Sequence, residues 1–145
     1  MLNIGLRMLH SREDAEDAVQ MAFLRLYRSI ATYRFEARFS TYFYRIMMNC
    51  CFDLLKKRQR LPQQQPEIAQ AAASPTVDLK LQLEEAIAGL PDRMRACFVL
   101  FAVHDVKQQE IARIMELSLG AVKSHIFQAK ARLRDVLSDT GEGQS

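Results

Sequence analysis

The sequence predicts an all-α fold: two small helical domains joined by a flexible linker, with a helix-turn-helix in the second domain. Apolar residues recur at three- and four-residue steps along most of the 145-residue chain, and no stretch shows the alternation typical of a strand. Residues 61–77 are rich in Pro, Gln, Ala and Ser, which is typical of a linker. This segment separates a predicted domain at 1–60 from one at 78–138, and a polar tail follows at 139–145.

The first domain is predicted to contain three helices. Residues 1–10 resemble the end of a helix whose earlier part is missing. Ser11 is a good cap for a second helix that runs to about residue 30, with Asp14 in the capping-box position. Its predicted buried face consists of Ala15, Val19, Ala22, Phe23 and Leu26. Residues 11–18 hold four acids against one arginine, a net charge of −3. An acidic first turn suits the helix dipole, but it also indicates a basic partner.

The third helix is predicted to begin at Ser40 or Thr41 and to reach about Lys57. Between residues 25 and 60, nine Lys or Arg stand against two acids, which gives a net charge of +7 and indicates a polyanionic partner. Aromatic residues are interleaved with Arg and Asn in this segment, a composition that suits unstacked bases and a phosphate backbone. The alternative is that several of these aromatic residues complete a small core.

Residues 107–137 are predicted to form the helix-turn-helix. Residues 115–117 make the turn, and Ser118 caps the second helix. On that helix an apolar stripe from Val122 to Val136 lies opposite a polar face, which a helix-turn-helix presents to the DNA major groove. An ordinary amphipathic helical hairpin is the alternative. The aromatic Phe127 on the polar face favours a partner.

The composition argues against an enzyme. The chain has no Gly-rich phosphate loop and no paired-carboxylate or Ser/His/Asp constellation, so we expect no catalytic residue and no cofactor. Cys50, Cys51 and Cys97 match no zinc spacing, which favours buried free thiols over a metal site. No apolar run approaches the ~20 residues that span a bilayer, and no signal-peptide core is present. We therefore expect a cytoplasmic protein without membrane insertion.

Three segments of the chain resemble one known family, the extracytoplasmic-function (ECF) sigma factors of bacterial RNA polymerase, within the sigma-70 family. The resemblance covers about Leu2 to Leu137. The segments are SREDAEDAVQMAFLRLYRSI, RFEARFSTYFYRIMMNCCFDLLKKR and LPDRMRACFVLFAVHDVKQQEIARIMELSLGAVKSHIFQAKARLRDVL. A helix-turn-helix alone is a weak signal, whereas all three segments in this order on either side of a linker are specific.

The resemblance implies a non-catalytic subunit that directs core RNA polymerase to specific promoters and initiates transcription. It implies polymerase binding by Asp14, Asp17 and Gln20. The residues implied at the promoter −10 element, where a flipped base is held, are Phe35, Arg38, Phe39, Ser40, Tyr42, Arg45 and Asn49. Those implied at the −35 element are Lys123, Ser124, His125, Phe127 and Gln128. The implied partners are core RNA polymerase, promoter DNA and a cognate anti-sigma factor.

The chain departs from the family pattern at several positions. Its first residues resemble the interior of the first conserved helix, so we expect an N-terminally short member of the family. Glu116 stands where a turn glycine is common, and a left-handed conformation there costs about 1 kcal/mol. Gln128 stands where relatives often have Arg; because Gln pairs with adenine rather than guanine, we expect a different promoter preference.

Two other functions remain open from the sequence. A stand-alone helix-turn-helix regulator that binds duplex DNA as a dimer would explain residues 107–137, but it leaves the acidic helix and the linker without a role. A truncated sigma-like interaction protein would bind polymerase or an inhibitor without supporting initiation. Activity with core polymerase separates the latter from a sigma factor.

Overall fold

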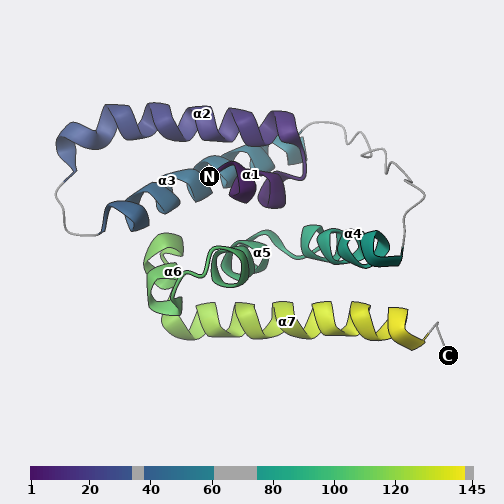
Figure 1. The fold of residues 1–145 in the computed structure, drawn as a ribbon. Coiled ribbons are helices and arrows are strands. Elements are labelled where there is room, and N and C mark those ends of the chain that lie inside the picture. The colour runs from purple at the N-terminus through teal and green to yellow at the C-terminus, as the bar shows by residue number, and fades with distance from the viewer. Residues whose placement is uncertain (34–37, 61–74, 143–145) are drawn as a thin grey trace.

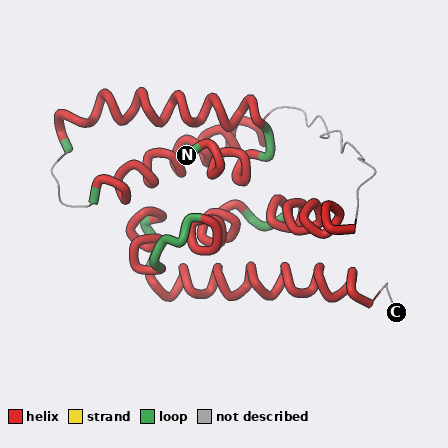
Figure 2. Tube along the Cα trace, viewed as in Figure 1, coloured by secondary structure: helices red, strands yellow, loops and turns green. Residues whose placement is uncertain are grey.

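The computed structural model describes residues 1–33, 38–60 and 75–142, with side chains in the last range from 79 to 138. Across these residues the backbone is helical apart from short connections, and no strand is present (Figure 2). The predicted all-α class is therefore confirmed. The helices form an N-terminal unit up to residue 60 and a C-terminal unit from residue 75 (Figure 1).

The N-terminal unit begins with helices α1 (Leu2–Leu9) and α2 (Arg12–Ser29). The predicted cap is confirmed, because the Ser11 hydroxyl accepts a 3.3 Å hydrogen bond from the Asp14 backbone N–H. The two helices approach closely at Gly5, where an added Cβ would lie 3.0 Å from the Cβ of Ala15. Glycine at this position therefore lets α1 pack directly on α2.

Helix α3 (Phe39–Arg60) follows the short 3₁₀ turn η1 (Ile30–Thr32) and packs on both α1 and α2. It begins before the predicted cap residues, so Ser40 and Thr41 lie inside its first turn, and that cap prediction is wrong. The reason is tertiary: the Thr41 hydroxyl donates to the carboxylate of Glu110 in the C-terminal unit instead of capping its own helix.

The C-terminal unit contains α4 (Pro75–Ala88), α5 (Asp92–Phe98), the π turn η2 (Val99–Val103), α6 (Gln108–Met115) and α7 (Leu119–Glu142). Helix α4 begins inside the stretch 61–77 that we predict as linker, at a proline whose fixed φ suits a first helical position. Helix α7 continues into the predicted tail. Polar composition does not end it, because extending an already nucleated helix by one residue costs little.

The two units pack against each other and share one hydrophobic cluster. Buried side chains from α1 and α3, such as Met8 and Met47, belong to the same cluster as Leu100, Ile111 and Val122 of the C-terminal unit. One hydrophobic cluster thus serves both units in this arrangement. Periodicity marks the apolar face of each helix but does not say which helix covers it.

The cysteines are buried free thiols, as predicted. Burial raises the pKa of Cys51 to about 12 and that of Cys97 to about 11, because an apolar environment disfavours the thiolate. Burial also raises the pKa of Cys50. None of the helices that the structure describes combines the length and the apolarity that crossing a membrane requires.

Candidate nucleic-acid interface

A tight, capped turn presents the second helix of the helix-turn-helix. Helix α6 ends at Met115, and Glu116 adopts the left-handed conformation with φ 55° and ψ 45°. The Ser118 hydroxyl then accepts a 3.1 Å hydrogen bond from the Ala121 N–H and caps α7. The predicted serine cap is confirmed, and Glu116 has the left-handed conformation that a turn glycine would adopt without strain.

Helix α7 separates a buried face from an exposed one. Val122, Ile126, Ala129 and Leu133 are buried, whereas Val136 at the end of the predicted stripe is exposed. The expected −35 residues lie on the other side: Lys123, Ser124, Phe127 and Gln128 are exposed, and His125 is half-buried. Phe127 is 74% exposed, which is unusual for a phenylalanine in a packed helix. This face of α7 is therefore accessible to a binding partner.

Two polar side chains of this face are already ordered with respect to each other. The Gln128 side-chain amide donates a 3.1 Å hydrogen bond to the hydroxyl of Ser124, one helical turn earlier. One amide hydrogen and the amide oxygen of Gln128 remain available to a ligand. The arrangement favours hydrogen bonding to a base edge.

The residues expected at the −10 element divide into groups with different surroundings. Phe35 lies outside the described residues. Arg38, Phe39 and Ser40, at the start of α3, are exposed. Tyr42 is half-buried: its hydroxyl donates to Ser29, and its ring lies 4.8 Å from that of Tyr33.

Phe39 joins a small aromatic group. Its ring is stacked 6.2 Å from that of Phe43, which in turn lies 5.4 Å from Phe23 of α2. Phe43 therefore packs against the core, as the alternative interpretation anticipates for some of these aromatic residues, while about half of Phe39 remains open to a ligand.

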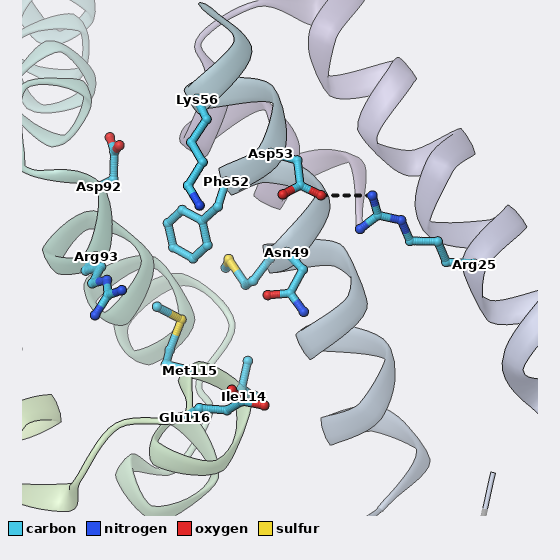
Figure 3. Close-up of a pocket in the computed structure, with 11 residues that line it drawn as sticks. Arg25, Asn49, Phe52, Asp53, Lys56, Asp92, Arg93, Ile114, Met115 and Glu116 are labelled. Atoms are coloured by element: carbon cyan, nitrogen blue, oxygen red, sulfur yellow. Dashed lines mark hydrogen bonds and ion pairs between the residues drawn. The ribbon is translucent and has the colours of Figure 1, made fainter. Parts of the chain in front are cut away.

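Arg45 and Asn49 lie on the side of α3 that faces the C-terminal unit. The Arg45 guanidinium donates a 2.7 Å hydrogen bond to the Arg113 carbonyl oxygen and lies 3.9 Å from the Glu116 carboxylate. Asn49 lines a cavity of about 530 Å³ between the units. Figure 3 shows this cavity, with Asn49, Phe52 and Lys56 of α3 facing Arg93, Met115 and Glu116. The expected −10 residues are thus not gathered on one open face.

The cavity contains more unpaired positive than unpaired negative charge. Arg25 pairs with Asp53 at 2.8 Å, and this hydrogen bond raises the pKa of Arg25 (Figure 3). Asp92 pairs with Arg95 at 3.1 Å. Lys56 makes no ion pair with any residue that the structure describes. In residues 1–33, 38–60 and 79–138, no group of His, Cys, Asp and Glu has the arrangement of a metal site.

The expected polymerase-binding residues lie along α2. Asp17 and Gln20 are exposed, whereas Asp14 is half-buried and forms an ion pair with Arg58 of α3. Asp14 therefore has a structural role within the N-terminal unit, in addition to any role in binding.

Sequence reasoning missed an apolar surface that continues from Gln20 along α2. We define this apolar patch by Phe23, Leu24, Tyr27 and Ile30, all of which are exposed. Together with Gln20 and Leu26 they line a shallow hollow of about 660 Å³. The prediction that Phe23 is buried is wrong, because no helix in the described residues covers this side of α2. The sequence does contain a pattern that indicates this surface, because residues 20, 24 and 27 continue the helical stripe that begins at Asp17.

A capped helix-turn-helix with a polar recognition face, in one chain with a cationic and aromatic helical unit, defines a DNA-binding transcription factor. Two family profiles match the chain. The profile described as "Sigma-70 region 2" matches residues 1–61, and that described as "Sigma-70, region 4" matches residues 80–133.

Curated relatives agree with these profiles. The chain is 31% identical over 133 residues to the ECF RNA polymerase sigma factor SigM of Mycobacterium tuberculosis, covering 90% of this chain and 68% of that protein. It is 29% identical to SigW of Bacillus subtilis, covering 92% and 80%. The sigma factor RpoE of Bartonella quintana, solved with the anti-sigma factor NepR, shares the fold with a TM-score of 0.75 at 17% identity, covering 94% of this chain and 89% of that chain. The chain therefore belongs to the ECF sigma factors of the sigma-70 family, and the predicted resemblance is confirmed.

Proposed function

We propose that the two units of this ECF sigma factor have different functions. In this proposal the domain at 1–60 binds core polymerase and melts and reads the −10 element. Residues 61–77 link it to the domain at 78–138, which reads the −35 element, and 139–145 form a tail. The observation that carries the proposal is the exposed recognition face of α7, with Phe127 at 74% exposure, on a chain that also matches sigma-70 region 2.

For polymerase binding, we propose that Asp14, Asp17 and Gln20 act together with the apolar patch on α2. An exposed cluster of large apolar side chains beside acids is typical of a protein-binding surface, because burial of such a cluster supplies affinity. Tyr27, at 81% exposure, is the most open member of the apolar patch. The acids would be directed at a basic surface of the polymerase.

For the −10 element, the proposed contacts are Phe35, Arg38, Phe39, Ser40, Tyr42, Arg45 and Asn49. Aromatic faces stack on unstacked bases, and the energy gained offsets the few kcal/mol that base flipping costs. The exposed ring of Phe39 beside Arg38 supports stacking on a base with a nearby phosphate contact.

For the −35 element, the proposed contacts are Lys123, Ser124, His125, Phe127 and Gln128. Lysine neutralises phosphate, whereas serine and glutamine bond to base edges. An exposed aromatic ring on this face suits the methyl group of thymine.

The chain itself would carry out no catalysis and need no cofactor, because core polymerase supplies the chemistry. We further propose a cytoplasmic location and an anti-sigma partner. Support for the latter comes from the similarity to RpoE of Bartonella quintana, which was solved with such a factor.

Reconstitution with core RNA polymerase tests the proposal. The chain is added to core enzyme, and run-off transcription is measured on a library of promoter fragments. We expect transcripts from fragments that share a −35 and −10 pair. Leu24→Ala is expected to weaken binding to core about tenfold, as substitution at an interface anchor does. Leu79→Ala removes a leucine of similar exposure, 50% against 56% for Leu24, from α4 and serves as the matched control.

Other outcomes would change the conclusion. Binding to core without transcripts would support the interaction protein instead. Dimeric binding to operator DNA without polymerase would support a stand-alone regulator. Failure to bind core polymerase would contradict a sigma-factor function for this chain.

A further inference from the structure

One stripe of α3 carries both promoter-contact residues and the contacts to the C-terminal unit. Thr41, Arg45 and Asn49 follow one another at four-residue steps, so they lie on one side of the helix. This side faces α6 and the turn that follows it. Arg45 and Asn49 are proposed −10 contacts, and in this arrangement both are turned toward the C-terminal unit.

The contacts along this stripe are specific rather than a loose apolar collapse. Thr41 is 2% exposed, and its hydroxyl donates to the carboxylate of Glu110. Arg45 makes its 2.7 Å hydrogen bond to the Arg113 carbonyl and approaches Glu116. We name these three interactions the polar latch.

The polar latch occupies groups that DNA would need. The Arg45 guanidinium donates to a backbone carbonyl and faces a carboxylate, so this arrangement directs it toward α6 rather than toward a phosphate or a base. Glu110 and Glu116 would also repel a DNA backbone placed against this stripe. The −10 strand and the C-terminal unit therefore require the same side of α3.

The recognition face of α7 is affected differently. Lys123, Ser124, Phe127 and Gln128 are exposed in the same closed arrangement and take no part in the polar latch. The closed chain thus leaves its proposed −35 surface open while it covers part of its proposed −10 surface.

We propose that the C-terminal unit is an intramolecular competitor of −10 DNA, held on α3 by the polar latch. The chain exchanges between a closed form that binds only −35 DNA and an open form that binds both elements. A ligand that needs Arg45 free shifts the chain toward the open form, by the reciprocity of linked equilibria. This inference rests on the proposed function, because it takes α3 as the −10 reader.

The test compares two variants of the full-length chain with equal charge. Glu110→Ala with Glu116→Gln removes both carboxylates of the polar latch. Glu85→Ala with Asp135→Asn removes two exposed carboxylates of the same unit that have no side-chain partner in the described structure. Fluorescence anisotropy measures binding to the single-stranded non-template −10 segment and, separately, to the −35 duplex of a promoter that the reconstituted enzyme transcribes. Small-angle scattering reports the radius of gyration.

The latch variant is expected to bind the −10 strand more tightly than the control variant, with unchanged −35 affinity and a larger radius of gyration. The gain approaches about tenfold if the open form is about a tenth of the wild-type population. Equal −10 affinity in both variants would overturn the inference, and so would parallel gains on both DNA fragments, which indicate a general charge effect.

The failures of the two proposals are distinguishable. A wild-type chain that transcribes with core polymerase, beside a latch variant that behaves like the control, overturns the inference alone. A wild-type chain that drives no transcription overturns the proposed function, and the inference with it.

Discussion

The guanidinium of Arg95 in α5 donates a 2.7 Å hydrogen bond to the carbonyl oxygen of Met8, 87 residues earlier in the chain. The same side chain donates to the carbonyl oxygens of Leu90 at 2.8 Å and Ala88 at 3.2 Å, and it pairs with Asp92 at 3.1 Å. Burial lowers the pKa of Arg95. One buried guanidinium thus donates hydrogen bonds to backbone carbonyl groups at the C-terminal ends of α1 and α4, and it connects the two units.

We expect Arg95→Met to lower the free energy of unfolding by about 3 kcal/mol, because backbone carbonyls lose their donor while the apolar volume is kept. Urea denaturation followed by circular dichroism measures the change. Arg93→Met is the control, since Arg93 is exposed and its loss should cost less than about 0.5 kcal/mol. Equal costs for the two variants would contradict the role assigned to Arg95.

Glycine has opposite roles at two positions. At Gly5 an added Cβ would meet Ala15 at 3.0 Å, so Gly5→Ala should force α1 away from α2 and cost about 1–3 kcal/mol. At Gly120 an added Cβ meets nothing within 4 Å, so Gly120→Ala should stabilise α7 by about 0.5–1 kcal/mol. Thermal unfolding of both variants checks the opposite signs.

The thiols should be inert in the native protein. The raised pKa values of Cys50, Cys51 and Cys97 keep them protonated at about pH 8, and burial blocks access. We expect a chromogenic disulfide reagent to react slowly with the folded chain and to titrate three thiols after unfolding in guanidinium chloride. Rapid reaction of the folded chain would indicate local opening of the shared cluster. Folding stability should also decline as the pH rises above 9.0, where the thiols of the unfolded chain ionise first.

His104 should make the fold sensitive to mild acid. Burial, the chain's N-terminal amine and Arg7 together lower its pKa below 6.5. The folded chain therefore binds a proton less readily than the unfolded chain, and the contribution of His104 is present above pH 6.5 and is lost as the pH falls. Urea unfolding at about pH 7.5 and 5.5 should show a smaller decline in stability for His104→Gln than for the wild type. Equal declines would show that other groups are responsible.

Gln128 should prefer adenine in the −35 element. Glutamine pairs with the N6 and N7 edge of adenine, whereas arginine pairs with guanine O6 and N7. Selection of −35 duplexes from a random pool should recover adenine at one position for the wild type and guanine there for Gln128→Arg. The discrimination should be about 1–3 kcal/mol, or roughly tenfold or more. An unchanged base preference would exclude Gln128 from base reading.

Features that depend on neighbours in the chain were predictable. The turn at Glu116 and the cap at Ser118 follow from residue types at fixed spacing, and the structure has both. Contacts between distant segments were not predictable. Periodicity marks Phe23 as apolar but does not reveal that its side of α2 is uncovered, and nothing local relates Thr41 to Glu110, 69 residues later.

The candidate site divides in the same way. The exposure of Phe127 and Gln128 follows from the opposite, buried stripe of a single helix. The position of Arg45 depends on where a second unit packs, so residue type alone predicts a basic contact but not its intramolecular partner.

Left-handed residues other than glycine at helix ends keep the chain below its maximum stability. His10, Asp105 and Glu116 have φ values of 54°, 56° and 55°, and glycine has no steric penalty at such positions. The left-handed conformation lowers the free energy of unfolding by about 1 kcal/mol for each of these residues, and a glycine in its place would avoid that cost. The natural sequence is therefore less stable than it could be at these three positions. Combining His10→Gly with Asp105→Gly, while keeping Glu116 because its carboxylate faces Arg45, should give a variant that tolerates damaging substitutions which the natural sequence does not, and hence a suitable background for dissecting the interface.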